Sequence, residues 1–121
     1  QTFRVVPTAQ ITLAVWKSIQ LAKAHVGSEP AKIVLIFLTG RIAAYYAEAC
    51  RLSGLESGVF EIHARLKQER RTEQSDAFRE AESGILFTSD VSSRGLDYPG
   101  VNAVIQVGAP DNKAEYIHRV G

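Results

Sequence analysis

Residues 88–97 carry the densest polar chemistry of this sequence. They follow the apolar run at residues 84–87, which is typical of a buried strand. At Thr88 the apolar side chains give way to hydroxyls, carboxylates, an arginine and a glycine. Open α/β sheets bind their ligands at the carboxyl ends of their strands. This stretch therefore predicts a binding site where the strand ends.

Strand-like and helix-like patterns alternate along the whole chain. The expected strands cover residues 1–6, 33–38, 58–62, 84–87 and 101–107, and the expected helices cover residues 9–26, 42–52, 68–82 and a final segment from Lys113. Short connections and continuous apolar strands indicate an α/β fold, a parallel sheet of about five strands with helices on both faces. No linker or repeat interrupts the pattern, so residues 1–121 are expected to form one domain.

Several strand-to-helix loops should bring polar groups to the same edge of such a sheet. Helix N-termini open there as well, and their free N–H groups favour anions. The polar groups lie at Thr39-Gly40-Arg41, residues 63–67, Ser89-Asp90 and residues 108–111. Taken alone, Thr39 or Ser89 is more often a simple helix cap. Taken together, these loops favour a site for a phosphate backbone.

Residues 65–71 hold four basic side chains and one acidic one. A charge run of this kind is usually a solvated helix face, on which Glu69 or Glu73 can pair with Arg70 or Arg71. The functional interpretation gains weight because the run lies on the same predicted edge. The net charge of the chain is only +1, so any argument for nucleic acid must rest on local clusters like this one.

Composition excludes several classes of protein. The chain is 45% hydrophobic and 22% charged, and no apolar run approaches the length of about 18 residues that a membrane span needs. No secretory signal is visible, and the single cysteine, Cys50, excludes an internal disulfide framework, so an intracellular location is expected.

Chemical motifs for independent catalysis are also missing from the sequence. The chain has no G-x-x-x-x-G-K-[ST] phosphate loop and no nucleophile motif. Its three histidines and one cysteine lack metal-ligand spacing. The chain is therefore not expected to complete a catalytic cycle alone.

Three ordered motifs resemble those of the second, C-terminal RecA-like lobe of DEAD-box RNA helicases, and the resemblance covers nearly the whole chain. Residues 88–97 resemble motif V, A-T-D-x-A-A-R-G-L-D, and residues 116–121 resemble the opening of motif VI, Y-I-H-R-x-G-R-x-x-R. The pattern H-G-x-x-x-Q-x-x-R followed by a helix phenylalanine is matched by His63, Gln68, Arg71 and Phe78, while residues 33–41 occupy the place of motif IV. The chain is thus expected to be an incomplete helicase domain that ends inside motif VI.

The resemblance implies ATP-dependent remodelling of RNA duplexes by two lobes that close over ATP and Mg²⁺. The N-terminal lobe, absent here, would bind most of the nucleotide, and no metal ligand is assigned to this chain. The residues that would contact RNA are Thr39, Gly40, Arg41, Gln68, Arg71, Ser89 and Asp90. Gly95 and Asp97 would face the nucleotide, and His118 and Arg119 would couple the two lobes.

The sequence departs from the family pattern at a few positions. Ala64 replaces a glycine, Lys67 replaces a helix-capping serine, and a motif IV phenylalanine is replaced by Ile36, with Phe37 one residue late. Loss of such a cap typically costs ~1 kcal/mol. The chain also stops before the motif VI arginines, which contribute ~10³ to 10⁵ in rate in related NTPases. The fragment alone is therefore expected to be inactive.

Two other functions remain open at this point. The first is a catalytically inert helicase-like module that binds RNA or protein, and the second is a small-nucleotide-binding domain, which the missing phosphate loop disfavours. A G-K-[ST] loop and an Asp-Glu-Ala-Asp segment upstream, with two arginines after Gly121, would favour the enzyme. The sequence of residues 88–90, 98–100 and 106–108 resembles the mitochondrial, fungal-type branch of the family, which implies a mitochondrial location. A nuclear or cytoplasmic location remains an alternative.

Overall fold

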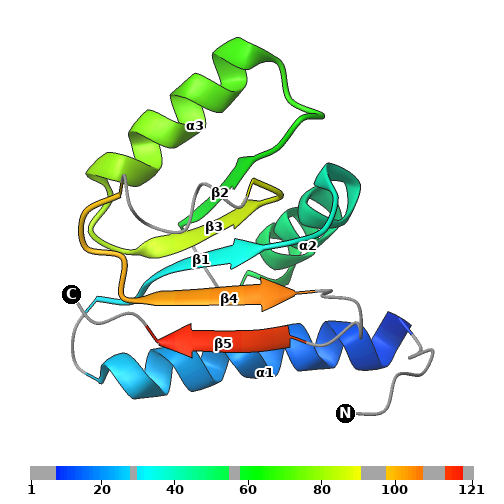
Figure 1. The fold of residues 1–121 in the computed structure, drawn as a ribbon, viewed down its shortest axis with the longest axis vertical. Coiled ribbons are helices and arrows are strands. Elements are labelled where there is room, and N and C mark those ends of the chain that lie inside the picture. Colours follow the sequence, from blue (N-terminus) through cyan, green and yellow to red (C-terminus); the bar gives the residue numbers. More distant parts are fainter. Residues whose placement is uncertain (1–7, 28–29, 55–57, 91–97, 108–113, 119–121) are drawn as a thin grey trace.

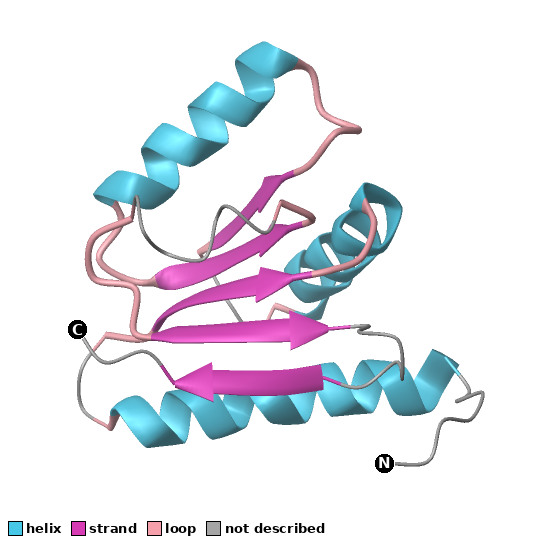
Figure 2. Cartoon of the chain, in the orientation of Figure 1, coloured by secondary structure: helices cyan, strands magenta, loops and turns pink. Residues whose placement is uncertain are grey.

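The computed structural model describes residues 8–27, 30–54, 58–90, 98–107 and 114–118, the last five and residues 8–14 by their backbone only. The elements, drawn in Figures 1 and 2, are α1 (Thr8–Val26), β1 (Lys32–Ile36), α2 (Gly40–Ser53), β2 (Val59–Ile62), α3 (Gln68–Glu80), β3 (Gly84–Thr88), β4 (Ala103–Val107) and β5 (Ala114–His118). The helices expected near residues 9–26, 42–52 and 68–82 are all present. The strand expected at residues 1–6 lies outside the described residues.

The five strands form one sheet in the order β2-β3-β1-β4-β5. Strands β1 to β4 are parallel, and β5 runs antiparallel to β4 (Figure 1). Ile36 and Ile62 both pair with Thr88, so the carboxyl ends of three strands meet at one edge. The α/β fold with a largely parallel sheet of about five strands is confirmed.

The prediction of a final helix from Lys113 is wrong, because residues 114–118 form strand β5. Ala114 pairs with Val107 and His118 pairs with Ala103. Without this partner, β4 would leave a row of backbone N–H and C=O groups unpaired at the edge of the sheet. Local sequence preference is a weak guide when a neighbouring strand offers a complete ladder of hydrogen bonds.

Helices α1 and α2 cover one face of the sheet. Alternate residues of β1 point to opposite faces, so Ile33 and Leu35 join the core on this side, as does Phe37 just after the strand. The Phe37 ring stacks on Tyr46 of α2, with 5.2 Å between ring centroids, and on Phe87 of β3 at 6.0 Å. Phe37 is therefore a core residue that fixes α2 against the ends of β1 and β3.

Helix α3 covers the other face through Phe78, which is fully buried. The Phe78 ring contacts Phe60 of β2 and Tyr98, with centroid separations of 5.3 and 5.1 Å. Val34 and Ile36 of β1 belong to the same cluster. The prediction of helices on both faces is confirmed, and α3 is anchored to the sheet chiefly through one aromatic side chain.

Lys32 is a buried cation at the amino end of β1, with only 1% of its surface exposed. Its Nζ donates to the carbonyl oxygens of Pro99 at 2.8 Å and Arg79 at 3.3 Å, and it lies 5.0 Å from the centroid of the Phe78 ring. Burial lowers the pKa of Lys32. The Arg79 carbonyl at the end of α3, the Pro99 carbonyl and an aromatic face are all favourable partners for a cation, so Lys32 has a structural role away from the candidate edge.

Candidate nucleic-acid interface

Three segments that carry predicted site residues meet at the carboxyl edge of the parallel strands. Thr39 follows β1, His63 follows β2, and Ser89 follows β3. A Cβ atom on Gly40 would lie 3.2 Å from the His63 Cβ and 3.5 Å from the Ala64 nitrogen. A side chain at this position would require its neighbours to shift by a few tenths of an ångström. The start of α2 and the loop at residues 63–67 (the β2–α3 loop) are therefore in direct contact.

Thr39 is the N-cap of α2, as the simple capping interpretation of this residue predicts. Its side chain accepts a hydrogen bond of 3.2 Å from the Ile42 N–H at the start of α2. The residue is exposed, as is Arg41, while Gly40 is half-buried. The cap orients the first turn of α2 toward solvent at the candidate edge, so capping and ligand binding do not exclude each other here.

The first turn of α3 holds the predicted Gln68 and Arg71. Gln68 is exposed, and its amide donates to the Thr72 hydroxyl at 3.3 Å. Lys67 occupies the N-cap position and makes no side-chain cap hydrogen bond, so the predicted loss of a cap is real. The N–H groups of the first turn of α3 are not capped by the Lys67 side chain, so they are available to bind an anion.

Arg70 and Arg71 differ although they are adjacent in the sequence. Arg70 is exposed and forms an ion pair with Glu73, as a solvated helix face would. Arg71 is half-buried, and its Nε is buried with no hydrogen-bond partner among the residues that the structure describes. Within the basic run, Arg70 is therefore paired locally, whereas Arg71 keeps an Nε–H donor that needs an acceptor.

The end of β3 is held rigidly under the candidate edge. Thr88 is fully buried, and its carbonyl accepts from the Phe37 N–H at 2.8 Å. The Asp90 N–H donates to the Thr88 hydroxyl at 3.1 Å, which closes a tight turn. Ser89 is half-buried and Asp90 is exposed. These two residues therefore lie on the same edge as Thr39 and the β2–α3 loop.

The remaining predicted residues are not brought to this edge by the described part of the chain. Gly95, Asp97 and Arg119 lie outside the described residues. His118 ends β5 and pairs with Ala103, which places its backbone near the amino ends of the parallel strands. The roles predicted for these four residues stay predictions.

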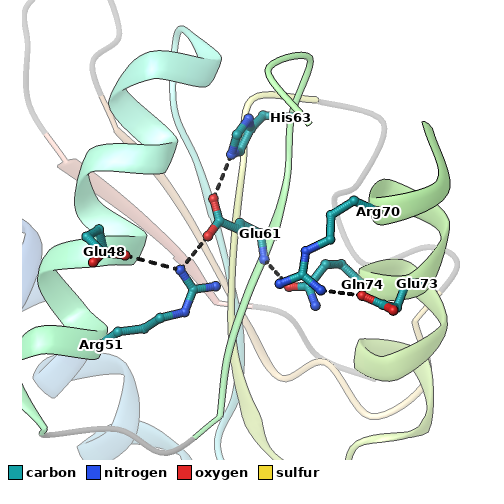
Figure 3. Close-up of polar contacts among 7 residues, drawn as sticks. All are labelled: Glu48, Arg51, Glu61, His63, Arg70, Glu73 and Gln74. Carbon is teal, nitrogen blue, oxygen red and sulfur yellow. Dashed lines mark hydrogen bonds and ion pairs between the residues drawn. The ribbon is translucent and has the colours of Figure 1, made fainter. Parts of the chain in front are cut away.

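A polar cluster built around Glu61 was not anticipated from the sequence. Its carboxylate Oε1 lies 2.7 Å from His63 Nε2, and its Oε2 forms an ion pair with Arg51 of α2 (Figure 3). The Glu61 N–H donates to the side chain of Gln74 in α3 at 3.0 Å. The sequence did contain an indication of this cluster. Residues two apart in a strand share a face, so Glu61 and His63 are expected to lie side by side.

The Glu61 carboxylate is held in its ionised form. Burial by itself raises the pKa of Glu61, but hydrogen bonds from His63 and Arg51 and the charge of Arg51 outweigh it, so the net pKa lies below its ordinary value. A carboxyl with a depressed pKa contributes stability that is fully present above its unfolded-state pKa. That contribution is lost as the pH falls through the lower folded-state pKa.

Glu61→Gln should therefore make unfolding less sensitive to acid. We expect the free energy of unfolding of the wild-type protein to fall more steeply than that of the variant between about pH 5 and about pH 3. Urea titrations at several pH values measure this, with Glu48→Gln as the control, because Glu48 is exposed and lies 3.7 Å from Arg51 without touching His63. Parallel pH profiles for wild type and Glu61→Gln would contradict the assignment.

Two properties of the described residues bear on the class of site. None of the helices within the described ranges combines the length and apolar character that crossing a bilayer requires. Within the same ranges, no group of three or more His, Cys, Asp or Glu side chains is placed to hold a metal ion.

Comparison with known proteins identifies the class to which this fold and edge belong. The model of the helicase conserved C-terminal domain matches residues 16–121. The chain therefore belongs to this family of helicase C-terminal domains.

The individual relatives are DEAD-box proteins. The chain is 47% identical over 90 residues to the mitochondrial ATP-dependent RNA helicase mss116 of Aspergillus oryzae, covering 74% of this chain and 14% of the relative. It is 45% identical over 101 residues to DEAD-box ATP-dependent RNA helicase 26 of Arabidopsis thaliana, covering 84% of this chain and 12% of the relative. The chain thus spans only a small part of the length of these relatives.

A solved structure has the same fold. Domain 2 of the Mss116p DEAD-box helicase, bound to an RNA duplex, matches with a TM-score of 0.66 at 24% identity, covering 82% of this chain and 40% of that one. The family match and the DEAD-box relatives confirm the identification made from the sequence motifs: this is a C-terminal RecA-like lobe of a DEAD-box helicase.

Proposed function

We propose that this domain is the RNA-binding and ATP-site-completing lobe of an ATP-dependent RNA helicase. The observation that carries the proposal is the convergence of the Thr39-Gly40 turn, the first turn of α3 and Ser89 on one edge of the sheet. Hydroxyls, a guanidinium and helix N-termini are groups that bind phosphate. Contacts to phosphate and sugar hold a nucleic acid without reading its sequence, which suits an enzyme that acts on many RNA duplexes.

Seven residues of this edge are proposed to contact the RNA backbone: Thr39, Gly40, Arg41, Gln68, Arg71, Ser89 and Asp90. Asp90 carries a negative charge, so we assign it to sugar hydroxyls rather than to phosphate. Each phosphate that a basic side chain neutralises should add a salt slope of ~0.7 for a single strand. The net charge of +1 makes these local contacts, rather than a general field, the source of affinity.

The second partner of this domain is proposed to be the N-terminal RecA-like lobe of the same polypeptide. That lobe would bind most of the ATP and Mg²⁺, and this lobe would complete the site through Gly95 and Asp97. His118 and Arg119 would couple the two lobes. Bound ATP and Mg²⁺ would supply the phosphoryl-transfer chemistry, while the residues of this chain hold and orient RNA. The name of the Aspergillus oryzae relative supports a mitochondrial location.

The proposed activity requires both lobes. We expect the full-length polypeptide to hydrolyse ATP several-fold faster when single-stranded RNA is added, and residues 1–121 alone to hydrolyse none. Release of phosphate with and without RNA measures both. RNA binding by the full-length polypeptide without any hydrolysis would replace the enzyme with an inert helicase-like module. Hydrolysis that RNA leaves unchanged would contradict the proposal.

A further inference from the structure

Glu61 connects three elements around the β2–α3 loop. Its side chain is only 12% exposed, and each carboxylate oxygen has a partner, His63 on one side and Arg51 on the other (Figure 3). Arg51 lies in the last turn of α2. Glu61 therefore joins the far end of α2 to the residue that begins the β2–α3 loop. It lies outside every stretch that the sequence motifs single out.

The carboxylate fixes the His63 ring. An ionised carboxylate only accepts hydrogen bonds, so the proton shared at 2.7 Å must lie on His63 Nε2. In the neutral ring this leaves Nδ1 without a proton. The ring is 2% exposed, and Nδ1 has no partner among the described residues. Among the described residues, Glu61 provides the one polar contact of the His63 ring, so this contact sets the orientation of the ring.

The His63 position in turn shapes the candidate edge. The His63 carbonyl accepts from the Leu66 N–H at 3.1 Å, which closes the turn that leads into α3. The His63 Cβ lies against Gly40, at the start of α2. A change in the ring would therefore shift both the loop before Gln68 and its contact with the Thr39-Gly40 turn.

Glu61 also holds α3 through its backbone. The Glu61 N–H donates to the side-chain oxygen of Gln74, which is buried. Gln74 lies three residues after Arg71 and four before Phe78, so all three share one face of α3. The strand residue that orients His63 is thus hydrogen-bonded to the helix face that carries Arg71.

We propose that Glu61 is a positioning residue for RNA binding, which holds His63, the β2–α3 loop and the first turns of α3 in the geometry that the RNA backbone requires. This inference rests on the proposed function. It assigns to Glu61 no contact with RNA. An ordinary surface ion pair would have little effect on binding, but this carboxylate acts through a buried ring whose other nitrogen has no partner among the described residues.

The test compares two substitutions of Glu61 in the full-length polypeptide. Glu61→Leu removes both acceptors, and we expect the dissociation constant for a single-stranded oligouridylate to rise about tenfold. Glu61→Gln keeps an oxygen that can accept from His63, and we expect it to restore most of the affinity. Glu48→Gln is the matched control, because it alters the other partner of Arg51 alone and should leave affinity unchanged.

Two readouts separate positioning from a merely structural role. If Glu61→Leu remains folded and binds the oligouridylate as tightly as wild type, the inference is overturned. Nitrogen NMR of the wild-type histidines gives a second test that needs no variant, because a neutral His63 protonated on Nδ1 would equally overturn it. Should Arg71→Ala also leave affinity unchanged, the proposed RNA edge itself fails, whereas a loss confined to Arg71→Ala refutes only the role of Glu61.

Discussion

Arg71→Ala should weaken the binding of single-stranded RNA by about tenfold to a hundredfold, which is the expected effect of losing a charge-assisted hydrogen bond. Arg71 lies in the first turn of α3, and its Nε is buried without a partner among the described residues. Because the side chain is already half-buried, its guanidinium should lose little further conformational freedom when it binds a phosphate. Because one phosphate contact is removed, the salt slope should fall by ~0.7. Titrations at several salt concentrations measure both quantities.

Arg70→Ala is the control for this experiment. Arg70 is the neighbouring residue on the same helix, it carries the same charge, and its ion pair with Glu73 is exposed. Such a pair contributes at most ~1 kcal/mol to stability. Affinity and salt slope should therefore change much less than in Arg71→Ala. Equal losses in the two variants would indicate that only the overall charge of α3 matters, and no loss in either would refute the edge.

Phe78→Ala should cost about 3 to 5 kcal/mol in the free energy of unfolding. Phe78 is fully buried, and its ring contacts Phe60, Tyr98 and the ammonium group of Lys32. Truncation to alanine leaves a cavity between α3 and the sheet and removes the aromatic face beside a buried cation. Urea titration of the polypeptide that carries this domain measures the loss.

Leu52→Ala provides the comparison for Phe78. Leu52 is also a large apolar residue in a helix, but it is 77% exposed. Its truncation should change the free energy of unfolding by no more than about 0.5 kcal/mol. A loss for Phe78→Ala that is no larger than this would mean that α3 is not anchored to the sheet through the Phe78 ring.

The sequence by itself determined most of the fold and the location of the candidate edge. Continuous apolar runs predicted β1, β3 and β4, because such strands are covered on both faces. Helical spacing of apolar residues predicted α1, and a stretch rich in alanine and tyrosine that ends at Ser53-Gly54 predicted α2. Once the strands were taken as parallel, the loops after β1, β2 and β3 had to emerge together. Thr39, the β2–α3 loop and Ser89 were therefore placed correctly without coordinates.

Only the tertiary structure decided the features that depend on contacts between distant residues. Residues 114–118 became a strand because β4 offered an unpaired edge. Lys32 is buried against carbonyls of Arg79 and Pro99, and Glu61 joins Arg51 to Gln74. Local sequence patterns indicate which face of a helix or strand is apolar, but they do not predict which polar groups from distant residues will contact one another. That choice is made when the helices pack on the sheet and each buried polar group needs a partner.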